Sequence, residues 1–260
     1  MMAMDVSFAL IATAAVVGLL VGLTGVGAGA AMTPALIGFF GVPVPTAIAT
    51  DLIFATITKT FGALVHGRAG QVNWKIATKM WAGSIPAVLV GSLFLVGLVG
   101  SGNTLWLTVL LIVLVGFTSW SLLKRAFFPT RDIADSPSQK APRWLAPAGG
   151  AGLGLGVSMT SVGAGVLGMA LLVKISPAGT PPRTLVATDL VHAIPIALVA
   201  GGTYWTAGLV DTSLLVELLI GSIPGVVLGA RLSSYIRPQV LNMILGLTLA
   251  VMTVLLIVGL

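Results

Sequence analysis

Thr24-Gly-Val-Gly-Ala-Gly29 and Thr160-Ser-Val-Gly-Ala-Gly165 are two glycine-rich stretches of nearly the same sequence, and each interrupts a long apolar run. The interrupted runs cover residues 6–40 and 145–173. A helix that spans a membrane needs about 20 mostly apolar residues. Uninterrupted runs of that order lie at 46–66, 76–99, 104–123, 185–203, 212–232 and 238–260. The pattern predicts an all-α, polytopic membrane protein with two broken helical segments.

The composition excludes the soluble classes of protein. The chain has 260 residues, of which 57% are hydrophobic and 8% are charged. Soluble domains are about 45–50% apolar and about 25% charged, so a soluble enzyme and a disordered chain are both excluded. The net charge of +6 does not indicate a nucleic-acid partner, because most basic residues lie between apolar segments, as they do in cytoplasmic loops. The chain has no Cys, which excludes disulfides and thiolate metal sites.

The two halves of the chain repeat each other. Ala49-Thr-Asp-Leu52 recurs as Ala187-Thr-Asp-Leu190, and Gly83-Ser-Ile-Pro86 recurs as Gly221-Ser-Ile-Pro224, both at an offset of 138 residues. The glycine-rich stretches recur in the same order, at an offset of 136 residues. This indicates an internal duplication, as many transporters have. We expect residues 1–123 to form the first repeat, 124–144 a cytoplasmic linker and 145–260 the second repeat.

The placement of basic residues predicts that the repeats are inverted. The loop at 66–79 carries Arg68, Lys75 and Lys79, whereas the matching loop at 204–211 has no Lys or Arg. Since Lys and Arg favour the cytoplasmic side, matching loops lie on opposite sides. The linker and the 174–184 connection are both basic, so the run 145–173 enters and leaves on one side as a hairpin of short helices. Each repeat then has one re-entrant hairpin plus three transmembrane helices, with the N-terminus outside and the linker inside.

The glycine-rich turns are candidate substrate-binding elements. Broken helices at equivalent positions of inverted repeats mark the central site of many transporters. Free N–H groups at the start of the helix that follows each turn favour an anion. Close packing of membrane helices on small residues is the alternative explanation. The candidate residues of the two turns are Thr24, Gly25, Gly27, Gly29, Thr160, Ser161, Gly163 and Gly165.

Two acidic residues, Asp51 and Asp189, lie inside apolar segments at equivalent positions of the two repeats. A carboxylate costs about 2.5–3.5 kcal/mol at the centre of a membrane helix, so these two are candidates for proton coupling. The alternative is that each caps the start of its helix.

Lys59 and His192 are the candidate positive groups for an anionic substrate. Lys59 could instead pair with Asp51 or extend to the membrane surface. His192 lies three residues after Asp189, on the same face of a helix, and either passes a proton or packs as a hydrogen-bonded histidine. Their repeat partners are Ala197 and Phe54, so we expect an asymmetric site.

Other residues give less information. Trp and Tyr gather at membrane surfaces, so we expect an interfacial role for Trp74, Trp81, Trp106, Trp144, Tyr204 and Trp205. Glu217 has no explanation in this reading. The sequence has no metal-ligand spacing, no Ser-His-Asp pattern and no phosphate-binding loop, so we expect neither a cofactor nor an enzyme.

The chain resembles the sulfite exporter TauE/SafE family of membrane permeases. The resemblance rests on Gly25-Val-Gly-Ala-Gly-Ala-Ala-Met-Thr-Pro34, Ala49-Thr-Asp-Leu52, Leu64-Val-His-Gly-Arg-Ala-Gly-Gln-Val-Asn-Trp74 and the Gly-Ser-Ile-Pro blocks. Asp51 stands where many members have Ser, which indicates an Asp-bearing branch. The resemblance implies export of small sulfur-containing anions, such as sulfite or sulfoacetate, driven by ion gradients.

The leading hypothesis is a secondary transporter of a small anion in the bacterial cytoplasmic membrane, coupled to protons and working by alternating access. An anion channel of the same fold is the second hypothesis, and a membrane protein that binds a lipid or partner without transport is the third. The expected partners are the anion, the coupling proton, the lipid bilayer and a second copy of the chain in a homodimer.

Overall fold

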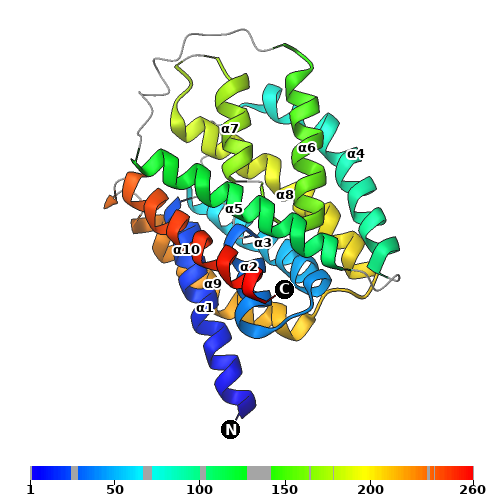
Figure 1. Ribbon diagram of the computed structural model, residues 1–260. Coiled ribbons are helices and arrows are strands. Elements are labelled where there is room, and N and C mark those ends of the chain that lie inside the picture. The colour runs from blue at the N-terminus through cyan, green and yellow to red at the C-terminus, as the bar shows by residue number, and fades with distance from the viewer. Residues whose placement is uncertain are drawn as a thin grey trace.

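The computed structural model describes residues 2–24, 29–66, 72–99, 104–127, 142–163, 165–177, 179–232, 235–236 and 238–259. Within these ranges the fold is all-helical, as predicted, and contains no strand. Figure 1 shows the arrangement of the helices: α1 (Met2–Thr24), α2 (Gly29–Phe40), α3 (Val44–His66), α4 (Trp74–Val99), α5 (Leu105–Phe127), α6 (Leu145–Thr160), α7 (Val166–Ile175), α8 (Pro182–Thr206), α9 (Thr212–Leu232) and α10 (Pro238–Val258).

The helices break where the glycine-rich turns predicted. Helix α1 ends at Thr24 and α2 begins at Gly29, while α6 ends at Thr160 and α7 begins at Val166. The lengths of α2, α6 and α7 are 12, 16 and 10 residues. At 1.5 Å per residue they are about 18, 24 and 15 Å long, too short to cross the ~30 Å hydrocarbon core.

The expectation of a short first arm is wrong for α1. This helix has 23 residues, which gives it a length of about 34 Å. The helix is longer than the part of the apolar run that precedes the break, because it also includes Met2–Asp5, ahead of residue 6.

Five helices of the described chain are long and apolar enough to cross a membrane. They are Trp74–Val99, Leu105–Phe127, Arg183–Thr206, Thr212–Leu232 and Gln239–Val258. Helix α3 was expected to be an ordinary span and is not among the five. Its sequence contains Asp51, Lys59 and five threonines, which lower its hydropathy. Protein rather than lipid surrounds much of it, since Asp51, Phe54 and Thr58 are fully buried.

Helices of one half pack mainly against helices of the other half. Helix α1 packs along α9, and its repeat equivalent α6 packs along α4, the equivalent of α9. Helices α3 and α8, which are equivalents, pack against each other, and so do α5 and α10. The two halves therefore interlock instead of forming separate lobes.

Small residues let these helix pairs approach closely. A Cβ on Gly225 of α9 would collide with the backbone carbonyl of Ala15 on α1, and one on Gly150 of α6 with that of Met80 on α4. In the membrane, where lipid tails are as apolar as the side chains, such contacts drive helix association. Close packing on glycine therefore explains glycines such as Gly225 and Gly150 within these helices, away from the two turns.

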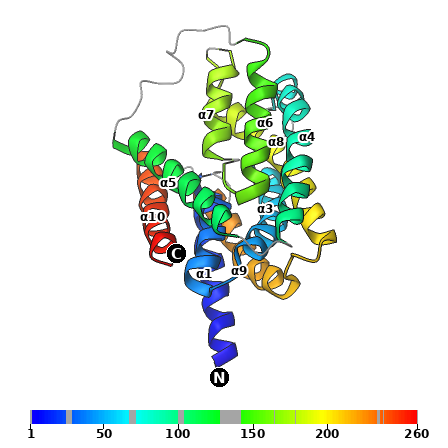
Figure 2. The same cartoon turned by 45° about the vertical axis from the view of Figure 1, so that its right-hand side comes forward.

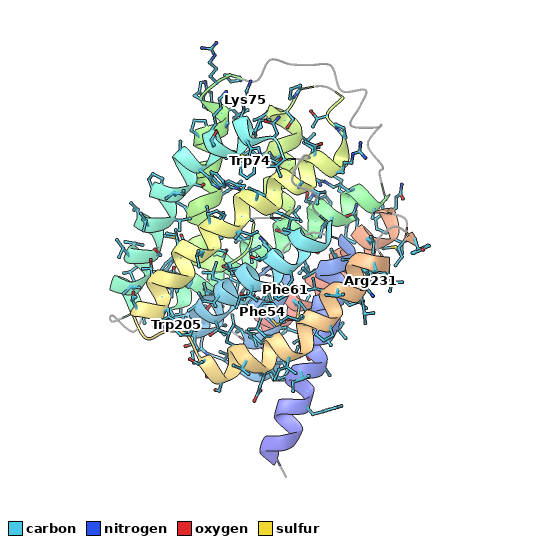
Figure 3. All side chains as sticks on the ribbon, turned by 180° about the vertical axis from the view of Figure 1, so that it is seen from behind. Phe54, Phe61, Trp74, Lys75, Trp205 and Arg231 are labelled. Atoms are coloured by element: carbon cyan, nitrogen blue, oxygen red, sulfur yellow. The ribbon has the colours of Figure 1, made fainter. Side chains whose placement is uncertain are left out.

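The two broken helix pairs begin at opposite ends of the molecule. In Figures 1 and 2, α1 starts at the lower end and α6 starts at the upper end. Figure 3 shows Lys75 at one end and Trp205 towards the other. Inverted repeats require such an arrangement. The side of the membrane on which each end lies stays a prediction.

Single-cysteine labelling of a chain without native Cys tests the orientation. Lys75 and Ala207 are both exposed, at the two matching loops. With inverted repeats, a membrane-impermeant maleimide added from the cytoplasmic side labels Lys75→Cys, and the same reagent added from outside labels Ala207→Cys. Labelling of both positions from the same side would contradict the inverted topology.

Candidate functional site

Helices α3 and α8 bring four ionisable side chains into the protein interior. Asp51 and Lys59 come from α3, and Asp189 and His192 come from α8. Their exposed fractions are 0, 4, 3 and 0%, respectively. The capping alternative for the two carboxylates is wrong, because each is the eighth residue of its helix, counted from Val44 and from Pro182. Only the first four N–H groups of a helix need a cap.

The Asp51 carboxylate is held by α2 and lies beside the second helix break. Its Oδ2 accepts a hydrogen bond of 2.5 Å from the hydroxyl of Thr33 on α2. The Ser161 hydroxyl, just after α6, interacts with the same carboxylate, although it forms no hydrogen bond in this geometry. The other oxygen, Oδ1, is buried without a hydrogen-bond partner. Asp51 therefore connects α2, α3 and the end of α6.

The Asp189 carboxylate packs against the first turn of α7. Its Oδ1 lies so close to Gly168 that a Cβ there would collide with it. The same oxygen is buried without a hydrogen-bond partner. The first turn of a helix carries partial positive charge, so this carboxylate occupies a position that favours an anion.

Lys59 lies inside the cluster and not at the membrane surface. It lies within electrostatic range of both Asp189 and Asp51. His192 also lies within electrostatic reach of it. With an exposed fraction of 4%, the side chain does not extend to the surface, so the alternative of a surface-directed lysine is wrong. One buried cation thus stands among two carboxylates and an imidazole.

His192 is positioned by two residues of α4: Ser84, which the sequence reasoning missed, and Trp81, which it expected at the membrane interface. Its Nε2 lies 3.1 Å from the Ser84 hydroxyl, and the Trp81 indole N–H donates to the His192 carbonyl oxygen at 3.2 Å. Ser84 belongs to the repeated Gly83-Ser-Ile-Pro86 block, so the repeat could have identified it. The imidazole Nδ1 is buried without a hydrogen-bond partner.

The aromatic residues divide between surface and core. Trp74, Trp144 and Trp205 are exposed, in agreement with an interfacial role, but Tyr204 is fully buried. The expectation for Tyr204 is wrong because its hydroxyl donates to the Ser158 carbonyl oxygen on α6, at 2.6 Å. This bond ties α8 to α6 two residues before α6 ends at Thr160.

The second helix break is buried inside the protein. Thr160, Ser161, Gly163 and Gly165 are all buried. Ser161 has a φ of 59° and Gly163 a φ of 116°, so the chain reverses through left-handed backbone conformations. The Thr160 hydroxyl donates to the Gly156 carbonyl and accepts from the Val162 N–H, so it serves the turn itself. The Ser161 hydroxyl has no partner and remains available.

The first helix break is described only at its edges. Thr24 ends α1 and Gly29 begins α2, whereas Gly25 and Gly27 lie outside the described residues. Glu217 of α9 is half-buried. No group of three His, Asp or Glu residues with the geometry of a metal site occurs in the part of the chain that the structure describes.

Buried polar atoms without partners concentrate at this cluster. Six such side-chain atoms occur among the described residues, and four of them are Asp51 Oδ1, Ser161 Oγ, Asp189 Oδ1 and His192 Nδ1. A buried polar group without a hydrogen bond costs about 1–3 kcal/mol. Four of them in the region that also contains Lys59 indicate a place built to receive a proton, water or a polar ligand.

Comparison with known proteins agrees with this architecture. The profile of the family described as "Sulfite exporter TauE/SafE" matches residues 10–256. The chain is 33% identical over 236 residues to "Probable membrane transporter protein YjnA" of Bacillus subtilis (strain 168), covering 88% of this chain and 91% of that protein. It is 28% identical over 248 residues to "Probable membrane transporter protein YdhB" of the same organism, covering 92% and 96%. No solved structure matches the chain.

The family match spans the helices that carry Asp51, Lys59, Asp189 and His192, and both helix breaks. The apolar helices and the transporter relatives make this a multi-pass membrane protein. The chain belongs to the sulfite exporter TauE/SafE family of membrane transporters.

Proposed function

We propose that this protein is a secondary transporter that moves a small sulfur-containing anion, such as sulfite or sulfoacetate, across the bacterial cytoplasmic membrane. The observation that carries the proposal is the burial of Lys59 within electrostatic range of Asp51, Asp189 and His192, each of which has one buried polar atom without a hydrogen-bond partner. An ammonium in a membrane interior is costly and needs a function or a counter-charge. The family supports a small anion as its cargo.

The anion would bind between Lys59, His192 and the second helix break. Lys59 supplies the charge, and Ser161 and His192 each present an unpartnered atom that can donate a hydrogen bond to an oxyanion. Gly163 and Gly165 carry no side chain, so an anion could approach the backbone at these two positions of the break. In the first repeat Thr24, Gly25, Gly27 and Gly29 would play the equivalent part.

A proton on Asp51 or Asp189 would couple to the anion. Ionised, each carboxylate repels an anion, and Asp189 itself lies at the first turn of α7, where an anion is favoured. Protonated, the same group loses its negative charge and becomes a hydrogen-bond donor. Proton and anion binding then favour each other, so the affinity for the anion rises as the pH falls.

Transport would proceed by alternating access around this buried cluster. The cluster lies where the equivalent helices α3 and α8 pack, between the two repeats. Rocking of one repeat against the other could open it first to one side and then to the other. The orientation with the N-terminus outside and the linker inside belongs to the same proposal.

Flux in proteoliposomes tests the function. We expect uptake of labelled sulfite or sulfoacetate that depends on an imposed pH gradient at zero membrane potential. Lys59→Met should lower this flux about 10- to 100-fold, the range of a lost buried charge contact of about 1.4–2.7 kcal/mol. Lys79→Met, which removes an exposed lysine, is the matched control and should transport normally. Flux that follows only the electrical potential would identify a channel instead, and absence of flux of either anion would refute the proposal.

Adding a methyl group at Gly168 tests the position of Asp189. Gly168→Ala should displace the carboxylate from α7 and destabilise the protein by about 1–3 kcal/mol, as overpacking does. It should also weaken the thermal stabilisation that sulfite gives to the purified protein, since bound ligand stabilises in proportion to its affinity. Gly152→Ala on α6 is the control, because nothing lies within 4 Å of its added Cβ. Equal sulfite stabilisation of both variants would exclude a link between Asp189 and the anion.

A further inference from the structure

Two hydrogen bonds join the halves of the protein directly beside the two buried carboxylates. The Asp211 N–H donates to the Thr50 hydroxyl oxygen at 3.0 Å, and the Asn73 N–H donates to the Thr188 hydroxyl oxygen at 3.0 Å. Thr50 precedes Asp51 on α3, and Thr188 precedes Asp189 on α8. Both threonines are buried, with exposed fractions of 0 and 1%.

The two bonds are equivalents in the internal repeat. Thr50 and Thr188 are 138 residues apart, and so are Asn73 and Asp211. One bond connects α3 of the first half to the residue before α9 of the second, and the other connects α8 to the residue before α4. Thr50 and Thr188 belong to the repeated Ala-Thr-Asp-Leu blocks, but nothing in the sequence shows that each threonine binds the opposite half.

The donors are rigid parts of their own helices. The Asn73 side chain accepts the Ile76 N–H at 3.2 Å and so caps α4, and the Asp211 side chain accepts the Leu214 N–H at 3.1 Å and so caps α9. Hydrogen bonds from the Ser213 hydroxyl and from Leu214 hold the pKa of the Asp211 carboxyl below its usual value. Each backbone N–H that reaches a threonine is therefore fixed to the start of a membrane helix.

The acceptors differ from other threonines of these helices. Thr58 on α3 and Thr203 on α8 use their hydroxyls within their own helix, bonding Phe54 and Val199. The Thr188 hydroxyl also donates its hydrogen to the Thr184 carbonyl of its own helix, at 2.6 Å, and accepts the bond from Asn73 with a lone pair. Only a hydroxyl can donate backward and accept from another half at the same time.

The bonds lie towards opposite ends of the protein. Asn73 adjoins Trp74, and Asp211 lies in the loop that follows Trp205; Figure 3 labels both tryptophans and shows them apart along the molecule. Both bonds are present together, so both inter-half contacts are closed in this conformation. A rocking motion that separates α3 from α9 must break one, and a motion that separates α8 from α4 must break the other.

We propose that Thr50 and Thr188 are paired positioning residues whose bonds to Asp211 and Asn73 act as matched latches of the transport cycle. Opening towards one side releases the Thr50 latch and keeps the Thr188 latch, and opening towards the other side does the reverse. Because each latch adjoins a buried carboxylate, its release also shifts Asp51 or Asp189. This inference rests on the alternating access of the proposed function.

Isosteric substitution separates the two latches. Thr50→Val and Thr188→Val keep the side-chain shape and remove the acceptor. With a reporter cysteine replacing Val162, which is buried beside the second break, labelling by an impermeant maleimide measures access from each side. We expect Thr50→Val to raise labelling from one side about fivefold and Thr188→Val from the other side by a similar factor, since one hydrogen bond contributes about 1 kcal/mol. The double variant should return the ratio of the two rates towards that of the parent.

The controls distinguish a latch from loss of structure. Thr58→Val and Thr203→Val remove hydroxyls that bond only within a helix and should leave both labelling rates unchanged. Thr50→Ser and Thr188→Ser keep the hydrogen-bond acceptor and should behave as the parent. If a valine variant does not fold, the alanine variant at that position is compared with the serine variant instead. Equal or same-sided shifts in the two variants would overturn the proposal. Labelling needs no substrate, so the two proposals can fail separately. Unchanged labelling in the valine variants, with intact anion flux, refutes the latches alone. Absence of anion flux in the parent protein refutes the proposed function.

Discussion

The structure depends on the burial of one ammonium among two carboxylates. Lys59, Asp51 and Asp189 lie in an interior that is otherwise largely apolar. Each charge alone would be strongly unfavourable there, and together they compensate only in part, because the pairing of buried charges seldom repays their full desolvation. Such a cluster is stable only if the surrounding helices exclude both lipid and bulk water from it. The architecture meets that requirement by packing α3 and α8 against each other, with the spans α9 and α4 against them.

Interlocked halves make this enclosure tight. Helix α1 reaches across to α9, and α6 reaches across to α4, on glycines that admit the partner backbone. Neither half could enclose the cluster alone, since Asp51 is held by α2 and faces the end of α6, while Asp189 faces α7 and the lysine of the other half. Any motion of the halves therefore changes the surroundings of the charges, which links the ionisation of the cluster to the conformation of the whole protein.

Local patterns predicted much of the fold but not the contacts between halves. Glycine-rich turns predicted both helix breaks, and a charged residue in an apolar run predicted the burial of Asp51 and Asp189, because both signals are local in the chain. The bonds of His192 to Ser84 and of Tyr204 to Ser158 join residues 108 and 46 positions apart. Hydropathy shows that such residues lie in the membrane, but it does not show which helix they face. The burial of Tyr204 was missed for that reason, since its hydroxyl finds a carbonyl on a helix of another pair.

The two repeats match in the hydrogen bonds that join the halves and differ in their positively charged side chains. In both repeats, the threonine beside the buried carboxylate accepts a hydrogen bond from the capping residue of a helix in the other half. The two bonds have the same length. The positive groups do not repeat, because Ala197 and Phe54 stand at the positions equivalent to Lys59 and His192. Equivalent contacts allow two conformations of similar free energy that differ in which half has moved. In the proposed function, a single set of positive groups would give one anion site, and the equivalent contacts of the two halves would let that site open to either side.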